Sequence, residues 1–520
     1  MILANTKIVP FTGSRAAHKL WLAEAIWGHR IERQSTSGLL LEFLSMAEGM
    51  HRQGKLLEHE LGYASYMPYL STQLRNLLFN NPSVEDIAQE SGNDEEAWHT
   101  WLTRMREVAV VEKESQRDFA YLRERFDSFQ SLVDLIALLR NITLDPATTR
   151  GWTYMLLFPI GPTAFYDERS LKRGKEGFER TRTVFTRTGE LAYLMLSRAR
   201  NEFRTEIANF LSVAFEPTAP KNRLLLRLIN GGHADLGEEK SGTYLPYATH
   251  PAFDRMAQDV LALFRLNLPG ADTFAHLGPL LAFHLLLYQF ESANAILGRD
   301  GLPALICEIL SPRPNLVRRA AVASHNDNES LGAQAVERYI EQLLGNDEEL
   351  SRVLADEHLS EVDKCEVLKD RIKALFALDQ QFDGTTLEQI RTEFLRIARK
   401  AYTDAAGDAV RSLSTQCGLA SRIRTTQYRY APSDQFLRNL VYVNVTSPMK
   451  ESDFLALLYA RYRIVIGSEE AALVGEDLYG PEFAKNHERL LRRLTAMGLA
   501  HRMSDSFTYV INPISEKYAG

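Results

Sequence analysis

The chain has 520 residues, of which 45% are hydrophobic and 24% are charged, a composition that is ordinary for a soluble globular protein and excludes a long low-complexity arm. Its net charge of −7 excludes nucleic-acid binding by the whole surface, so any such contact depends on local basic patches. At about 150 residues per domain, the length predicts three or four folding units.

The sequence predicts a cytoplasmic protein that does not bind a membrane. Three cysteines lie far apart and form no CxxC pair, which indicates a reducing compartment without a disulfide framework or a structural zinc site. The N-terminus lacks a basic stretch followed by a long apolar core. The longest apolar run, 279–290, contains His284 and Gln289 and is too short to span a bilayer.

Helices are predicted through most of the first 150 residues. Pro82 and Ser83 begin a helix that ends near Ser91 and Gly92. Charged residues dominate 93–125, as expected for a solvent-facing helix or helix pair. A stripe at helical spacing then predicts a helix face that packs into the core, formed by Phe129, Leu132, Leu135, Ile136 and Leu139.

Residues 152–160 are the clearest strand candidate in the interior of the chain, with a buried helix as the alternative. A basic segment, 168–187, follows, and two glycines make its first half loop-like. Cations in such a loop can contact phosphates, whereas the alternative is a solvated loop balanced by acidic neighbours. The candidate phosphate-binding residues are Lys172, Arg173 and Lys175.

The chain between 188 and 413 is predicted to be largely helical. Apolar spacing indicates one long helix over 188–215 and a helical region over 251–297 with a break at Pro269. Residues 331–413 are predicted to be entirely helical. Within them, 385–389 contains a capping box in either of two registers, which predicts a helix start.

A second cationic cluster lies within 411–430. Arginines interleaved with aromatic residues suit nucleic acid, because bases stack on aromatic rings while arginines meet phosphates. The alternative is that the tyrosines pack into the core. The cluster consists of Arg411, Arg422, Arg424 and Arg429, with Tyr428 and Tyr430 between them.

Common catalytic signatures are missing from the sequence. It has no GxxxxGK[ST] loop, which excludes a Walker-type ATPase, and no GxGxxG, GxSxG or HExxH motif. These absences remove the usual dinucleotide, serine-hydrolase and zinc-protease sites. We therefore predict no cofactor, and we expect that the protein is not an enzyme.

A set of histidines gives a weak indication of a metal site. His276 and His284 are eight residues apart on a predicted helix and share a face, with Glu291 seven residues further on. Together with His233 and His250 they could supply ligands, although helical metal pairs usually stand three or four residues apart. The alternative is that each is a core histidine with one satisfied hydrogen bond.

Two constellations leave a nuclease as an alternative function. Arg319 and His325 have a spacing that resembles HEPN-type ribonucleases, in which an arginine and a general base lie near the scissile phosphate. Asp235 and Glu238 with Lys240 resemble the acidic-plus-lysine endings of metal-dependent nucleases, although the flanking strands of such sites are not predicted.

The last part of the chain has the most informative element order, and we call residues 447–513 the terminal module. Ser447 and Pro448 predict the start of a helix, because serine caps a helix and proline suits its first position. The β-branched run 464–466 then predicts a short strand. Ser468 is predicted to cap a brief second helix that extends to Leu473.

A third helix and a hairpin complete the terminal module. Gly480 and Pro481 begin the helix, and Gly498 stands where a left-handed C-terminal cap is expected. Residues 499–511 predict two strands around a Ser-Asp-Ser turn, before Asn512 and Pro513 end the pattern.

Helix, strand, two helices and a hairpin resemble the winged-helix superfamily, including the run GLAHRMSDSFTYVINP, which is typical of a third-helix end and wing. The resemblance covers about an eighth of the chain. It implies that the third helix enters the major groove of DNA and that its exposed side chains meet phosphates or guanine edges. The residues expected in this role are Lys485, Asn486, Arg489, Arg492 and Arg493 on the helix, with His501 and Arg502 on the wing.

The sequence therefore predicts a mainly α, multi-subdomain helical protein with a small C-terminal winged-helix (α+β) domain. Four domains are predicted: 1–150, 151–300, 301–446 and 447–520. The second of them contains the predicted strand at 152–160. The function expected from this architecture is a non-enzymatic, DNA-associated scaffold or accessory subunit of a bacterial multi-protein complex, in DNA maintenance or phage defence. Its expected partners are DNA and other protein subunits. A protein-only adaptor and the nuclease described above are the alternatives.

Overall fold

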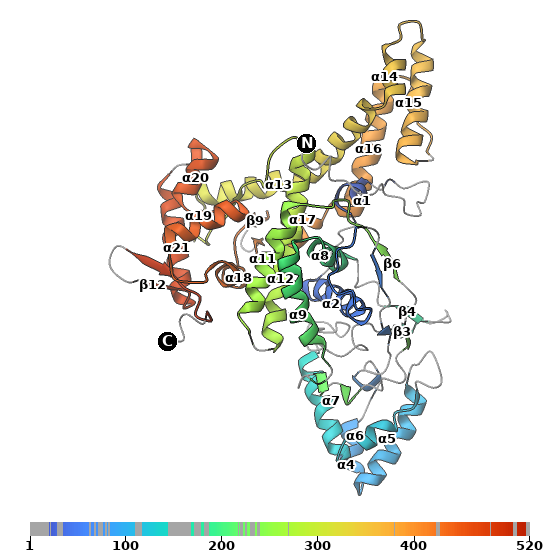
Figure 1. Cartoon of the computed structure of the whole chain (residues 1–520), viewed down its shortest axis with the longest axis vertical. Helices are drawn as coiled ribbons and strands as arrows, with labels where there is room; N and C mark the ends of the chain where they lie inside the picture. The colour runs from blue at the N-terminus through green and yellow to red at the C-terminus, as the bar shows by residue number, and fades with distance from the viewer. Residues whose placement is uncertain are drawn as a thin grey trace.

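Helices dominate the computed structural model of the chain (Figure 1). The predicted fold class is confirmed at this level: the protein is mainly α, and its strands are two to four residues long. The structure describes residues 20, 22–28, 35–61, 64–66, 69–70, 76–78, 81, 84–109, 117–143, 168–170, 178–180, 187–216, 218, 222–223, 226–228, 235–236, 240–268, 270–311, 313–378, 380–422, 427–478, 480–502 and 507–515. The predicted strand at 152–160 lies outside these residues.

A bundle of helices around α12 (Gly270–Ile296) forms the centre of the molecule (Figure 1). All residues from 277 to 290 are buried, because neighbours cover this helix on every side. The other helices of the bundle are α1 (Leu22–Trp27), α2 (Thr36–Arg52), α8 (Thr188–Ser197), α9 (Asn201–Phe215), α11 (Pro251–Arg265), α13 (Leu316–Gly345), α16 (Leu387–Ala406), α17 (Ala409–Gln416) and α18 (Asp434–Asn444).

α2 and α8 pack closely against each other, and a glycine makes this contact possible. A Cβ atom at Gly189 would lie 2.2 Å from Leu39 O, so only glycine fits there. The first turn of α8 is capped by a buried carboxylate: Glu42 accepts hydrogen bonds from the backbone N–H groups of Arg187 at 2.8 Å and Gly189 at 3.0 Å. A negative charge is stabilised at this position by the positive end of the helix.

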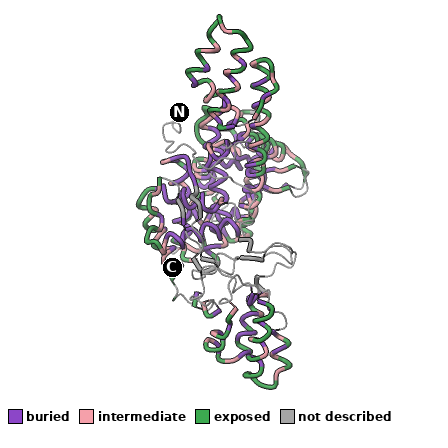
Figure 2. The backbone as a smooth tube through the Cα atoms, turned by 90° about the vertical axis from the view of Figure 1, so that its right-hand side faces the viewer, coloured by how far each residue is buried: buried purple, intermediate pink, exposed green. Residues whose placement is uncertain are grey.

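Two helical extensions leave the bundle at opposite ends of the molecule (Figure 1). One has its own core, in which Trp98, Trp101 and Phe129 pack edge to face. It consists of α4 (Val84–Glu90), α5 (Asp94–Val108), α6 (Tyr121–Arg125) and α7 (Phe129–Thr143). The other consists of α14 (Glu348–Ala355) and α15 (Glu361–Phe376); α15 packs against α16, and α14 packs against α15. Figure 2 shows buried residues concentrated in the middle and exposed residues at both ends.

Most of the strands form isolated two-stranded antiparallel pairs. The pairs are β1 (Ala64–Tyr66) with β6 (Lys240–Thr243), β2 (Tyr69–Leu70) with β5 (Asp235–Leu236), β3 (Glu168–Ser170) with β4 (Phe178–Arg180), and β8 (Ala420–Ser421) with β9 (Arg429–Tyr430).

The terminal module contains the predicted order of helix, strand, two helices and hairpin. In chain order its elements are β10 (Met449–Lys450), α19 (Glu451–Tyr462), β11 (Ile464–Val465), α20 (Ser468–Val474), a 3₁₀ turn (Glu476–Leu478), α21 (Pro481–Ala496), β12 (Ala500–Arg502) and β13 (Thr508–Val510). β12 and β13 form the hairpin, and β10 adds a third strand on the other side of β13. Membership of the winged-helix superfamily stays a prediction.

One strand of the terminal module, β11, pairs with a strand outside the module. β11 runs parallel to β7 (Leu305–Ile306), with Ile464 opposite Leu305 and Val465 opposite Ile306. Residues from all four predicted domain ranges contribute to the main core. The terminal module is therefore joined to the bundle by backbone hydrogen bonds and shared apolar packing, and the predicted domain boundaries stay predictions.

Several local predictions are confirmed by the structure. The stripe on α7 is buried, Thr386 and Gln389 form the capping box of α16, and Gly498 has a φ of +71° after α21. The predicted break in the helical region 251–297 is also confirmed, because α11 ends at Arg265 and α12 begins at Gly270.

Three predicted helix boundaries are wrong. The segment 188–215 is two helices, α8 ending at Ser197 and α9 beginning at Asn201, and the Arg198 guanidinium at the break donates to the backbone oxygens of Leu245 at 2.8 Å and Tyr247 at 2.6 Å. The helix predicted from Ser447 begins at Glu451, since the two preceding residues pair with β13 instead. In α20, Ser468 is the first helical residue and Gly467 is the cap.

A buried ion network stands next to β7. Glu308 has no exposed surface and accepts from Arg429 Nε at 2.6 Å and from Arg318 Nε at 3.0 Å. Arg429 is also fully buried, and Arg318 donates to Ser311 O at 2.6 Å. Burial of a charge is costly unless it is paired and hydrogen-bonded, so this network fixes β9, β7 and the start of α13 to one another.

We predict that Arg429→Met lowers the free energy of unfolding by about 3 kcal/mol, because it leaves part of the Glu308 charge uncompensated in the interior. Urea unfolding followed by circular dichroism measures the change. The control is Arg396→Met on the exposed side of α16, which should change stability by less than about 0.5 kcal/mol. Equal stability of the two variants would contradict the role of the network.

Candidate nucleic-acid interface

The α21 helix carries most of the predicted interface, and its sequence explains why it forms. Pro481 occupies the first helical position, where its missing N–H costs nothing, and Gly480 before it is extended. Phe483, Leu490 and Leu494 recur at helical spacing and are buried. The helix therefore presents one face to the protein and the opposite face to solvent.

Asn486 was expected to be exposed on α21, and this prediction is wrong. Its side chain has no exposed surface. Nδ2 donates to Cys307 O at 2.9 Å and to Ile466 O at 3.0 Å, and Oδ1 accepts from the Ile309 N–H at 2.8 Å. The amide therefore connects α21 to the ends of β7 and β11 and has no polar atom left for DNA.

Arg493 was also predicted to face solvent, but it is held against the bundle. Its Nε lies 2.5 Å from Asp434 Oδ1 and its Nη1 donates to Pro432 O at 2.8 Å. The side chain is 23% exposed. Arg493 therefore fixes α21 to the start of α18, and this contact engages two of the donors that a phosphate would need.

Arg489 lies between the buried and exposed faces of α21. The residue is half-buried, and its Nη1 has no hydrogen-bond acceptor among the described residues. A partly covered arginine is a weaker candidate for DNA contact than an exposed one, because reaching a phosphate would require the side chain to leave its packed position.

Lys485 and Arg492 are exposed on the outer face of α21. Arg492 Nη2 lies 3.1 Å from Glu488 Oε2 one turn before it, and both side chains are largely exposed. An exposed pair of this kind contributes only about 0–1 kcal/mol, so a phosphate can displace the glutamate. Nearby His487 adds no positive charge at neutral pH, because burial lowers its pKa.

The wing sheet also has an exposed aromatic face that the sequence did not predict. The register aligns Lys450, Tyr509 and His501 across the three strands, so these side chains share one face of the sheet. Phe507, two residues before Tyr509, is 50% exposed, and the Lys450 Nζ lies 5.2 Å from its ring centroid. The alternation of Phe507 and Tyr509 in the hairpin was the signal that could have identified this face. Arg502, at the end of β12, is also exposed.

For the predicted phosphate-binding loop, the structure describes only the short strands on either side of the candidate residues. Residues 168–170 and 178–180 form the antiparallel pair β3–β4. Lys172, Arg173 and Lys175 between these strands lie outside the described residues.

The second cationic cluster is divided between the core and the surface. Arg429 and Tyr430 are fully buried, so packing is the correct interpretation for these two residues. Arg422 is exposed, whereas Arg411 and Tyr428 are half-buried. Arg424 lies outside the described residues.

The histidine set does not assemble into a metal site within the part of the chain that the structure describes. His250 Nδ1 caps α11 by accepting from the Ala252 N–H, and burial lowers its pKa to about 3. His284 Nε2 lies 2.9 Å from the buried carboxylate of Asp259. His276 Nδ1 lies 2.5 Å from Asn439 Oδ1, whereas His233 is not among the described residues.

The two constellations behind the nuclease alternative do not form a site in the described residues. On α13, Arg319 is exposed whereas His325 is fully buried, since six residues place them on different sides of a helix. Asp235 and Lys240 belong to different strand pairs, and Glu238 lies outside the described residues.

Known proteins give no further guide to the site: no family model, curated protein or solved structure matches the chain. Among the described residues, no helix has both the length and the apolar character needed to cross a membrane.

We predict that Asn486→Leu lowers the free energy of unfolding by about 2–3 kcal/mol, because it leaves two buried carbonyls and one buried N–H without partners. The matched control is the adjacent Lys485→Leu, which should change stability by less than about 0.5 kcal/mol. Urea unfolding of both variants measures the difference. A stable Asn486→Leu protein would show that the amide does not hold α21 in place.

Because His325 is buried, we predict that the free energy of unfolding depends on pH. Burial, followed by the charge of Arg411, lowers its pKa from 6.5 to about 4. The unfolded chain therefore binds a proton that the folded protein rejects, and stability falls as the pH drops from about 6.5 towards 4. His325→Phe keeps a ring beside Tyr428 and Tyr430 and should remove about 2 kcal/mol of this loss between pH 7.5 and pH 5. Urea unfolding at the two pH values tests this, and an unchanged pH dependence would contradict it.

Proposed function

We propose that the protein is a non-catalytic, DNA-associated scaffold whose terminal module contacts duplex DNA as a winged helix does. The observation that carries the proposal is the exposure of Lys485 and Arg492 on α21 together with Lys450 and Arg502 on the wing sheet. α21 is the third helix of the module and the sheet follows it, which is the arrangement in which a winged helix places a helix in the major groove and a wing beside it.

The charge of the terminal module supports DNA contact through a few exposed side chains rather than through the whole surface of the module. The terminal module contains eight Lys and Arg residues against nine Asp and Glu residues. The module as a whole therefore does not attract a polyanion, and binding depends on which side faces the DNA. Lysine and arginine side chains that neutralise phosphates release counterions, so the binding constant should fall steeply with salt.

The contact surface is smaller than the sequence predicted. Asn486 and Arg493 are engaged in internal contacts, and Arg489 is half-buried. The proposed interface therefore consists of the exposed cations, with the aromatic face around Phe507 at its edge. Connections between the module and the bundle transmit its position to the remaining helices, which are available for other protein subunits. The context of DNA maintenance or phage defence remains a hypothesis from architecture alone.

We predict that the triple variant Lys485→Glu, Arg492→Glu and Arg502→Glu binds a labelled duplex of about 30 base pairs at least tenfold more weakly at low salt. The slope of log K against log salt should shrink by about 1 for each phosphate that the variant no longer neutralises. Fluorescence anisotropy measures both quantities.

The control for this test is a triple reversal with the same change in charge on a remote helix. Arg391→Glu, Arg396→Glu and Lys400→Glu alter exposed residues of α16 and should leave duplex binding within about twofold of the unmodified protein. Equal loss in both triple variants, or no salt-dependent binding by the unmodified chain, would overturn the proposal and favour a protein-only adaptor.

A further inference from the structure

A cleft runs along one face of α17. Its volume is about 210 Å³. Four residues of α17 that line it recur at helical spacing, so they project to the same side. The lining residues are Asp408, Arg411, Ser412, Thr415, Gln416 and Tyr428.

Two arginines converge on the aromatic ring of this cleft. The guanidinium carbon of Arg411 lies 5.3 Å from the centroid of the Tyr428 ring, and that of Arg422 lies 5.4 Å from it. Arg422 is exposed, and Tyr428 is half-buried. Asp408 is the one carboxylate among the lining residues. Asp408 and Glu329 both pair with Arg411, whereas Arg422 forms no ion pair within the described residues, so Arg422 is the cation beside the ring that can attract an anionic ligand.

Arg411 is held in a fixed orientation with unused donor capacity. It pairs with Glu329 through Nη2, and its Nη1 lies 3.3 Å from Asp408 Oδ1. Its Nε is buried and has no acceptor among the described residues. A buried donor without a partner is uncommon in folded proteins and requires an explanation. An arginine oriented in this way can meet a tetrahedral oxyanion with little loss of side-chain entropy.

The Tyr428 ring is itself supported from the protein interior. His325 lies under it, with the ring centroids 5.7 Å apart and the planes 18° from parallel. His325 has no exposed surface, and both of its ring nitrogens lack a hydrogen-bond partner among the described residues. Its Nδ1 lies 3.7 Å from Glu329 Oε2, the same carboxylate that pairs with Arg411. The aromatic wall of the cleft is therefore packed against a buried ring of the protein interior.

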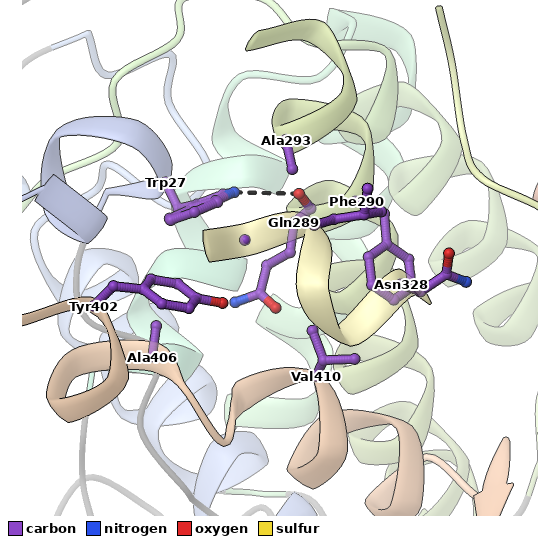
Figure 3. Close-up of a pocket in the computed structure, with 10 residues that line it drawn as sticks. Trp27, Gln289, Phe290, Ala293, Asn328, Tyr402, Ala406 and Val410 are labelled. Atoms are coloured by element: carbon purple, nitrogen blue, oxygen red, sulfur yellow. Dashed lines mark hydrogen bonds between the residues drawn. The ribbon is translucent and has the colours of Figure 1, made fainter. Parts of the chain in front are cut away.

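Another cavity among the described residues is unsuited to a ligand. It lies where α1, α12, α13, α16 and α17 meet, and Figure 3 shows Gln289 pointing toward Tyr402 inside it. Its free volume of about 10 Å³ is close to the minimum for one water molecule. Trp27 Nε1 donates to Gln289 O at 3.2 Å across it. A Cβ atom at Gly332 would lie 1.9 Å from the Tyr402 hydroxyl, so this cavity is a packing seam.

We propose that the α17 cleft binds a phosphate monoester. Arginine forks match phosphate geometry, and the hydroxyls of Ser412 and Thr415 with the amide of Gln416 supply neutral donors along the same face. The volume exceeds what phosphate alone requires and leaves room for an attached sugar beside the Tyr428 ring. The same chemistry is present in a free nucleoside monophosphate and in the 5′-phosphate end of DNA.

Isothermal titration calorimetry with inorganic phosphate, a nucleoside monophosphate and the matching unphosphorylated nucleoside tests the proposal. The phosphate-bearing ligands should bind with a dissociation constant below about 1 mM, and the nucleoside should bind at least tenfold more weakly. A 5′-phosphorylated oligonucleotide compared with its 5′-hydroxyl form shows whether a DNA end or a free nucleotide is the better source. Absence of binding by every phosphate, or equal binding of the nucleoside, would overturn it.

Two substitutions assign the binding to the cleft. Arg422→Gln removes an exposed cation, and Arg411→Lys keeps the charge but removes the fork; each should weaken binding of the monophosphate at least tenfold. Arg396→Gln on α16 is the control. Unchanged affinity in both cleft variants would overturn the proposal. Because Arg422 is exposed, its substitution should change stability by less than about 0.5 kcal/mol, so a loss of binding cannot be attributed to unfolding.

The same variants separate this inference from the proposed duplex contact. The triple reversal in the terminal module should leave monophosphate binding within about twofold, and Arg422→Gln should leave duplex binding within about twofold. Loss of monophosphate binding in the triple reversal would overturn the assignment to the cleft.

Discussion

A carboxylate without exposed surface, Glu308, sets the geometry of the region where the bundle meets the terminal module. A single buried carboxylate is unstable in a protein interior unless cations and hydrogen bonds surround it. Arg429 and Arg318 supply the cations, and they come from segments that are far apart in the sequence. Next to this network, Asn486 bonds to three backbone groups at the ends of β7 and β11. The position of α21, and therefore of every exposed cation on it, follows from these buried polar contacts.

The internal contacts also divide the basic residues of α21 into those that are packed against the protein and those that face solvent. Arg493 directs its donors to α18, and Arg489 is partly covered, whereas Lys485 and Arg492 remain on the solvent side. Arg492 and Arg493 are adjacent and chemically identical, but Arg492 faces solvent whereas Arg493 contacts α18. A helix turns by about 100° per residue, so neighbouring positions face different environments. Counting basic residues along a helix therefore overestimates the surface that a phosphate backbone could reach.

Local sequence patterns predicted most of the helices, but they could not predict which distant segments of the chain pair with each other. The buried stripe of α7 and the capping box of α16 depend on residues within a few positions of each other, and both predictions are confirmed. The start of α19 was misplaced because Met449 and Lys450 pair with a strand about sixty residues later. For the candidate interface, helical spacing identified Lys485 and Arg492. The burial of Asn486 depends on β7, which no pattern within the module could indicate.

The parallel pairing of β7 with β11 has a consequence for how the chain folds during synthesis. Leu305 leaves the ribosome long before Ile464, and in the interval the edge of β7 that β11 will cover has no partner from the later segment. Contacts between distant segments form slowly, because the intervening chain must first lose conformational freedom. Nascent chains that stop within this interval would present an open strand edge to other molecules. Synthesis of the terminal module therefore covers the open edge of β7 as well as adding further helices to the protein.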